Sequence, residues 1–506
     1  VRPAMLADHE VVKTITIDEK IAFWREVMRY AKSRGIDVYV FTWNAFTWGA
    51  TGKYGITDAL DNPVTVAYLR ASVRELVRTY PLLAGIGITA GENMVLKGAN
   101  ADAVREQWLW STYGEGIRDA LKEDPARKVT LIHRFHMASQ DAILAAWKNY
   151  PGQFQFSFKY SVAHMYSITH PPFLDPVLPQ LTAGRKTWLT VRNDDIYTFR
   201  CGDPDYIRDY VTNMPAAEKL AGFYVGPDGF TWGRDFLDRS PGPAGPDLII
   251  RKQWYSFMLL GRLAYDPTLG NAYFERVLAA HFPSADGTKL YAALQAAAQT
   301  MPLITRFFWG DIDLKWFPEA CLSHPPYHGF YTVKDFVAGE SMPGSGVMNI
   351  RRWREALANR APMPGVTPLQ IADALDGAAA RALENVSALR AETAASASEE
   401  LSKTLVDCEA LGWLARYYAD KIRAACALAL YDHDALPTEQ QAAVHQLKNA
   451  VLAWKAYAAA RDGQYRPALY NRVGFMDITA LTQKAEDDVT LAAGWKPGQG
   501  LVAPLR

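Results

Sequence analysis

VYVFTWN, residues 38–44, is an apolar run that ends in an aromatic and a polar side chain, Trp43 and Asn44. Five later segments repeat this design, and a helix-type pattern follows each one. They are GIGITAGEN (85–93), KVTLIHRFH (128–136), QFSFKYSVAH (155–164), KTWLTVRNDD (186–195) and AGFYVGPDGFTW (221–232). Short apolar runs that alternate with helices are typical of a parallel sheet covered by helices. The sequence therefore predicts an α/β fold.

The end of each run carries side chains suited to chemistry. In a (β/α) barrel, the active site lies where the carboxyl ends of the strands meet. The residues at these ends are Trp43, Asn44, Glu92, Asn93, His133, Arg134, His136, Lys159, His164, Arg192, Asp194, Asp195, Asp228 and Trp232. Together they predict a polar pocket with aromatic walls.

Composition excludes several classes of partner. The 54 Lys and Arg residues balance 54 Asp and Glu residues, so the chain has no basic field for nucleic acid. No apolar stretch is long and uncharged enough to span a bilayer. The four cysteines have neither zinc-site nor disulfide-scaffold spacing. We therefore expect no nucleic acid, no membrane and no structural metal.

Length and pattern divide the chain. At 506 residues it is too long for one ordinary domain. After about residue 365 the strand-like runs disappear, and long alanine-rich amphipathic patterns follow one another. We expect a barrel catalytic domain over 1–340, a Pro/Gly-rich linker over 341–366 and a helical bundle over 367–506. The helical domain is also the surface through which we expect a homodimer.

The order of these segments resembles the catalytic barrel of the α-glucuronidases of glycoside hydrolase family 67, and more loosely that of family 115. The resemblance covers residues 18–282. Its main segments are YAKSRGIDVYVFTWNAF (30–46), TDALDNPVTVAYLRASVRELVRTYPLLAGIGITAGEN (57–93) and QWYSFMLLGRLAYDPTL (253–269). It implies a TIM-type (β/α)8 barrel of which strands three to eight are visible.

The same resemblance implies an activity and its residues. The expected reaction is exo-hydrolysis, with inversion, of a terminal α-linked glucuronic acid or related uronate on a polysaccharide-derived oligosaccharide, without a cofactor. Glu92 aligns with the general acid, which must be partly desolvated to keep its proton. The family's two water-activating carboxylates align with Asp194 and His164. Asp194 is the expected base, and His164 departs from the family pattern, since an imidazole replaces the acid.

The other candidates have a substrate-binding role and a structural alternative. Arg134, Lys159 and Arg192 would hold a substrate carboxylate at the barrel mouth, or pair with nearby acids. Trp43 and Trp232 would stack on sugar rings, or cap the core. The remaining predicted substrate-binding residues are Asn44, Asn93, His133, His136, Asp195 and Asp228.

Two other functional classes stay open. One is a uronate-polysaccharide lyase, in which a His or Lys removes the proton next to a uronate carboxylate. The substitution at His164 keeps this class in view. The other is a non-catalytic carbohydrate-binding barrel.

The start of the chain carries a further expectation. Only 17 residues, VRPAMLADHEVVKTITI, precede the first helical pattern, too few for two more strand–helix units. We therefore expect strands one and two upstream of Val1 in a longer polypeptide, or on a separate chain. A bacterial periplasmic or secreted location is favoured over the cytoplasm.

Overall fold

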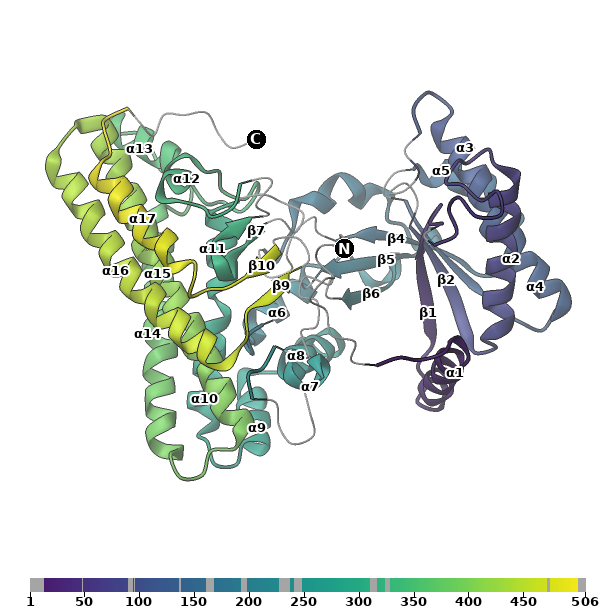
Figure 1. The fold of residues 1–506 in the computed structure, drawn as a ribbon, viewed down its shortest axis with the longest axis horizontal. Coiled ribbons are helices and arrows are strands. Elements are labelled where there is room, and N and C mark those ends of the chain that lie inside the picture. Colours follow the sequence, from purple (N-terminus) through teal and green to yellow (C-terminus); the bar gives the residue numbers. More distant parts are fainter. Residues whose placement is uncertain are drawn as a thin grey trace. The chain divides into compact units, whose positions relative to one another are not determined.

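The structure is a computed structural model that divides into two compact units (Figure 1). The first comprises residues 1–160, 176–191 and 215–224, and the second comprises 161–175, 192–214 and 225–506. This division by packing falls inside residues 1–340, the predicted catalytic domain. The structure describes residues 13–47, 49–89, 94, 96–135, 138–160, 168–192, 198–226, 237–240, 248–309, 316–323, 328–470 and 474–498.

Each of the six quoted runs forms a strand of one sheet. The strands follow one another in chain order from one edge to the other, and the registers of the first five are parallel. They are β1 (Val38–Trp43), β2 (Leu83–Thr89), β3 (Thr130–Arg134), β4 (Phe154–Lys159), β5 (Thr187–Arg192) and β6 (Leu220–Gly226).

The predicted (β/α)8 barrel is wrong. The described residues form six strands in one open order, whereas a closed barrel of this type needs eight. The sheet is nevertheless strongly curled. The rings of Phe41 and Tyr224, which lie on the two edge strands, have centroids only 5.3 Å apart. The sheet is therefore a curled half-barrel with a concave face.

On this concave face, aromatic rings of β1 pack over glycine residues of β2. A Cβ atom added to Gly87 of β2 would lie 2.1 Å from the Phe41 ring, and one added to Gly85 would lie 2.8 Å from the Tyr39 ring. Tyr39 also reaches Trp188 of β5, with ring centroids 6.4 Å apart. Glycine in β2 thus lets the rings of β1 lie flat across the sheet, which favours its curl.

Helices cover the convex face, where side chains such as Ile86, Ile88 and Leu131 are fully buried. The second helix begins at Pro63, because the Asn62 side chain accepts hydrogen bonds from the first-turn amides and proline suits the first helical position. The helices of this unit are α1 (Ile17–Ser33), α2 (Pro63–Thr79), α3 (Ala101–Leu109), α4 (Glu115–Glu123) and α5 (Gln140–Ala146), with a π-helical turn over Trp110–Gly114.

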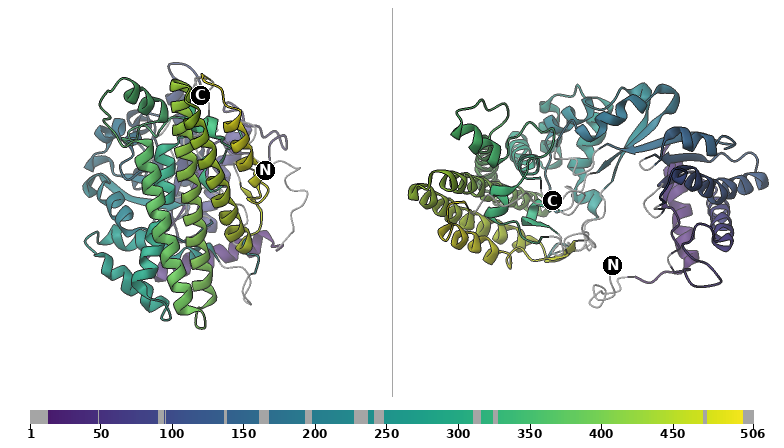
Figure 2. Two further views of the ribbon diagram at one scale, coloured as in Figure 1. Left: turned by 90° about the vertical axis from the view of Figure 1, so that its left-hand side faces the viewer. Right: turned by 90° about the horizontal axis from the view of Figure 1, so that it is seen from above.

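Three long helices dominate the second unit and run side by side (Figures 1 and 2). They are α14 (Pro368–Thr393), α15 (Glu399–Asp434) and α16 (Pro437–Gln464), and all three lie in the segment that the sequence predicts as helical. The shorter helices are α6 (Pro204–Thr212), α7 (Ile249–Lys252), α8 (Trp254–Tyr265), α9 (Asn271–His281), α10 (Gly287–Ala298), α11 (Thr300–Phe307), α12 (Val333–Ala338), α13 (Ile350–Ala358) and α17 (Thr482–Ala493).

Short elements complete the second unit. Two two-stranded antiparallel sheets are formed by β7 (Trp316–Phe317) with β8 (Leu322–Ser323) and by β9 (Ala468–Tyr470) with β10 (Gly474–Met476). The segment predicted as a linker contains α13, whose Ile350 and Trp353 are buried. Among the described helices, none is both long and apolar enough to cross a membrane.

The fit between Gly87 and Phe41 gives a stability test. Gly87→Ala should lower the free energy of unfolding by about 1–3 kcal/mol, because the new methyl group overlaps the ring. Gly184→Ala is the control in the same unit, since nothing lies within 4 Å of its Cβ position, and should change stability by less than about 0.5 kcal/mol. Urea denaturation measures both. Equal effects would contradict the proposed packing of the concave face.

Candidate active site on the concave face of the sheet

The strand register gathers polar side chains at the carboxyl end of the concave face. Phe41 pairs with Gly87 and Gly87 with Ile132, so the residue two positions further along β3, Arg134, shares the face of the Phe41 ring. Arg134 in turn pairs with Ser157 of β4. Lys159 is two positions beyond Ser157 and therefore shares this face as well.

Hydroxyl groups from β5 and β6 complete this surface. Thr190 pairs with Lys159 in the sheet, and its hydroxyl donates a 2.7 Å hydrogen bond to the Tyr224 hydroxyl. Burial raises the pKa of Tyr224, while the Thr190 hydrogen bond and the charge of Arg134 lower it to a smaller extent. The concave face thus combines two cations with neutral hydroxyl groups.

Asn44 joins the carboxyl ends of β1 and β2. It directly follows β1 and is fully buried, and its amide nitrogen donates to the carbonyl oxygen of Thr89 at the end of β2. Its other amide atom, Oδ1, is buried and accepts no hydrogen bond from any residue that the structure describes. Asn44 therefore links the ends of the two strands from a buried position.

His133 does not lie on the concave face. It alternates with Arg134 along β3, so its side chain points to the helix-covered side, where it is fully buried. Its Nε2 lies 2.8 Å from the Glu106 carboxylate of α3, which also accepts a 3.1 Å hydrogen bond from the Trp147 indole. The predicted substrate-binding role does not fit this placement, and we assign His133 a structural role.

Two further predicted residues end strands of the sheet. Trp43 and Arg192 are the last residues of β1 and β5, and their side chains lie outside what the structure describes. The roles predicted for Trp43 and Arg192 therefore stay predictions, and so do the roles of the residues that lie outside the described ranges. The predicted residues that lie outside the described ranges are Glu92, Asn93, His136, His164, Asp194, Asp195, Asp228 and Trp232.

Sequence reasoning missed Ser157, Thr190 and Tyr224, because it considered the strand ends alone. The pattern that reveals them is the alternation of polar and apolar residues in QFSFK and TWLTVR, which places every second residue on one face. The same alternation separates His133 from Arg134.

The described residues offer no metal site. No group of three or more His, Cys, Asp or Glu side chains in the described ranges could hold an ion. The four cysteines all lie in those ranges and form no disulfide bond, and Cys321, Cys408 and Cys426 are buried. The arrangement on the concave face is therefore one of cations, hydroxyls and aromatic rings.

Comparison with known proteins shows the fold. No protein-family model matches the chain, and no curated protein matches its sequence. A solved structure that resembles it is described as a GH138 enzyme targeting pectin rhamnogalacturonan II, with a TM-score of 0.77 at 16% sequence identity. The match covers 94% of this chain and 58% of that one, so this chain spans little more than half of that protein's length. The chain therefore shares its fold with that protein, and the match does not specifically support families 67 and 115.

The buried contact between His133 and Glu106 gives a second stability test. His133→Ala should lower the free energy of unfolding by about 3–5 kcal/mol, because the substitution removes the closer of the two partners of the buried Glu106 carboxylate and leaves only the Trp147 indole among the described residues. The control is His170→Ala, an exposed histidine 3.7 Å from Asp175, with an expected effect below about 1 kcal/mol. Chemical denaturation measures both. A His133→Ala protein of normal stability would show that the contact is not a structural one.

Proposed function

We propose that this protein is a glycoside hydrolase that acts on a uronate residue of a polysaccharide-derived oligosaccharide. The observation that carries the proposal is the pair of cations, Arg134 and Lys159, on one face of adjacent strands at their carboxyl ends. In barrel-type folds this is the end of the sheet that carries chemistry. The fold shared with a GH138 enzyme supports a carbohydrate substrate.

The concave face can bind each part of such a sugar. The planar guanidinium of Arg134 matches a carboxylate through two parallel hydrogen bonds, and Lys159 adds a second positive charge. The Tyr224 hydroxyl offers a hydrogen-bonding group for a sugar hydroxyl. Phe41, which is 40% exposed, provides an apolar ring for the C–H face of a pyranose.

The bond-breaking residues in this proposal come from the sequence resemblance. Glu92 would protonate the leaving oxygen, and Asp194 would remove a proton from the attacking water in a single displacement that inverts the anomeric centre. Each residue follows the carboxyl end of a strand, β2 and β5 respectively. This is the edge of the sheet at which Arg134 and Lys159 would hold the sugar. His164 follows β4 and would orient the water or contact the uronate.

Product analysis separates the hydrolase from its two alternatives. The full chain is incubated with glucuronoxylan fragments, ulvan, arabinogalactan and rhamnogalacturonan II oligosaccharides, and the products are identified by mass spectrometry. Release of a saturated uronic acid supports the proposal. An ultraviolet-absorbing unsaturated uronate would instead identify a lyase, and binding without any product would identify a carbohydrate-binding protein.

The cation pair is tested by substitution. Arg134→Met and Lys159→Met should each lower kcat/KM on the uronate substrate by about 10- to 150-fold, the value of one charge-assisted hydrogen bond of about 1.5–3 kcal/mol. Lys186→Met is the matched control, because this exposed lysine immediately precedes β5 at the opposite, amino-terminal edge of the sheet. Steady-state kinetics of the three variants measure the effect. Equal losses in all three would remove the cation pair from substrate binding.

The general acid is tested separately. Glu92→Gln keeps the shape of the side chain and a hydrogen bond but removes the transferable proton, so turnover should collapse while substrate binding largely survives. Kinetics and calorimetric titration on the same substrate report the two quantities. Near-normal turnover in this variant would exclude Glu92 from the mechanism.

A further inference from the structure

Tyr54 is a tyrosine that the first unit leaves almost entirely in water. It is 93% exposed and belongs to the segment 44–62, which connects β1 to α2. A single exposed aromatic residue is common on protein surfaces and needs no explanation by itself. The backbone of Tyr54 supplies a second, independent observation.

The backbone of Tyr54 lies in the left-handed region, with a φ of 52°. Gly55 follows it with a φ of 78°, and the Ile56 amide donates a 2.9 Å hydrogen bond to the Lys53 carbonyl oxygen. Residues 53–56 therefore form a tight turn with positive φ at both central positions, as in a type I′ turn. Asn, Asp and Gly are the residues preferred there, and a bulky side chain is an outlier. Tyrosine is thus a poor choice for stability at this position.

The turn is braced, so the exposed ring has a fixed origin. The Gly52 amide donates a 2.8 Å hydrogen bond to the Ile56 carbonyl oxygen, and the Ile56 side chain is buried. Asn62 Nδ2 donates a 2.8 Å hydrogen bond to the Gly55 carbonyl oxygen. The Oδ1 of the same side chain accepts from the Val64 amide and so caps α2. Asn62 therefore fixes the turn to the start of the helix. A ring held in this way loses little conformational freedom when a ligand binds to it.

The segment that carries Tyr54 leaves the sheet at the edge that the proposed function uses. Its first residue, Asn44, directly follows the carboxyl end of β1, and Arg134 and Lys159 lie at the carboxyl ends of β3 and β4. A second aromatic residue of the segment, Phe46, is 57% exposed. In barrel-type folds, the loops at this edge contact the substrate. The strained turn thus belongs to a loop that borders the proposed sugar-binding face.

The chemistry of a tyrosine ring suits a sugar. The flat apolar ring packs against the C–H face of a pyranose, and the phenol hydroxyl can exchange hydrogen bonds with sugar hydroxyls. The proposed substrate is an oligosaccharide, so sugar residues continue beyond the one that is released. Strain in a well-ordered backbone is found where a conformation serves a function. A glycan therefore accounts for the exposure of Tyr54, its strain and its position in the chain.

We propose that Tyr54 is a stacking platform for a sugar of the leaving oligosaccharide, at least one residue beyond the first sugar after the cleaved bond. The inference rests on the proposed hydrolase function and deepens it, because it makes recognition depend on the length of the chain. A disaccharide would not reach the platform, whereas longer oligosaccharides would.

Steady-state kinetics on substrates of increasing length test the platform. Tyr54→Ala should raise KM on the longer oligosaccharides by about 2- to 10-fold, the range expected for one aromatic contact, with kcat unchanged. KM on the disaccharide should stay at the wild-type value. Tyr54→Trp, which keeps an aromatic ring, should bind substrates of every length about as well as the wild type. Tyr265→Ala is the matched control, because Tyr265 is 92% exposed at the end of α8, and it should change neither value.

Urea denaturation tests the strain. Tyr54→Gly and Tyr54→Ala both remove the ring, but only glycine adopts a positive φ without steric cost. Tyr54→Gly should therefore unfold at a higher urea concentration than Tyr54→Ala, although both variants lose the length dependence of KM. Equal midpoints would show that the turn is not strained and would remove the basis of the proposal.

The outcomes separate the platform from the hydrolase. Normal cleavage with a wild-type KM for Tyr54→Ala at every length would overturn the platform and leave the proposed function intact. If none of the glycans is cleaved, calorimetric titration of the same oligosaccharides with the wild type and Tyr54→Ala decides. Weaker binding of the longer chains by Tyr54→Ala would then support the platform without catalysis. Equal affinities, or no binding of any glycan, would overturn it.

Discussion

The contact between the rings of β1 and the glycines of β2 is the constraint on which the first unit depends. Tyr39 and Phe41 cross the concave face where Gly85 and Gly87 present no side chain. The fit allows the two edge strands to approach across the face, so that Phe41 reaches Tyr224. A half-barrel formed in this way directs alternate residues of six strands toward a common region. The proposed sugar-binding surface is a consequence of that curl.

Alternation along the strands then decides which polar residues take part. Arg134 and Lys159 point to the concave face, while His133 packs against Glu106 under the helices. The same strand therefore supplies one residue to the proposed chemistry and the next to the stability of the core. A polar side chain near a strand end is a candidate for the site only when the alternation along its strand places it on the concave face.

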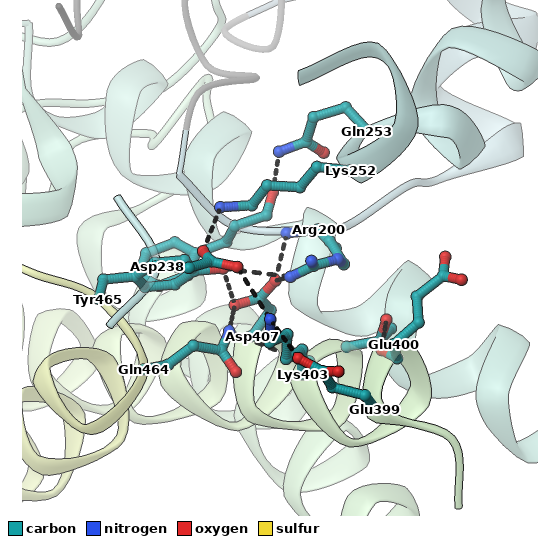
Figure 3. A network of polar contacts seen from close by, with 12 residues as sticks. Arg200, Asp238, Lys252, Gln253, Glu399, Glu400, Lys403, Asp407, Gln464 and Tyr465 are labelled. Carbon is teal, nitrogen blue, oxygen red and sulfur yellow. Dashed lines mark hydrogen bonds and ion pairs between the residues drawn. The ribbon is translucent and has the colours of Figure 1, made fainter. Parts of the chain in front are cut away.

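Local features were predictable from the sequence, and long-range ones were not. The six strands, the Asn62–Pro63 helix start and the three long helices follow from local patterns of apolar residues, capping and turns. Closure into an eight-stranded barrel came from the family resemblance and is wrong, because strand runs do not determine whether a sheet closes. A buried network around Asp407 in the second unit joins Arg200 to Tyr465 across 265 positions (Figure 3), and no local pattern connects such distant residues.

The central claim is that the concave face recognises the carboxylate of a uronate. It is tested most directly by comparing kcat/KM on the cleaved uronate oligosaccharide with kcat/KM on the same oligosaccharide after reduction of its carboxyl group to an alcohol. The account predicts a loss of at least about tenfold on the reduced substrate, since both cations then lose their charged partner. Equal rates on the two substrates would contradict it.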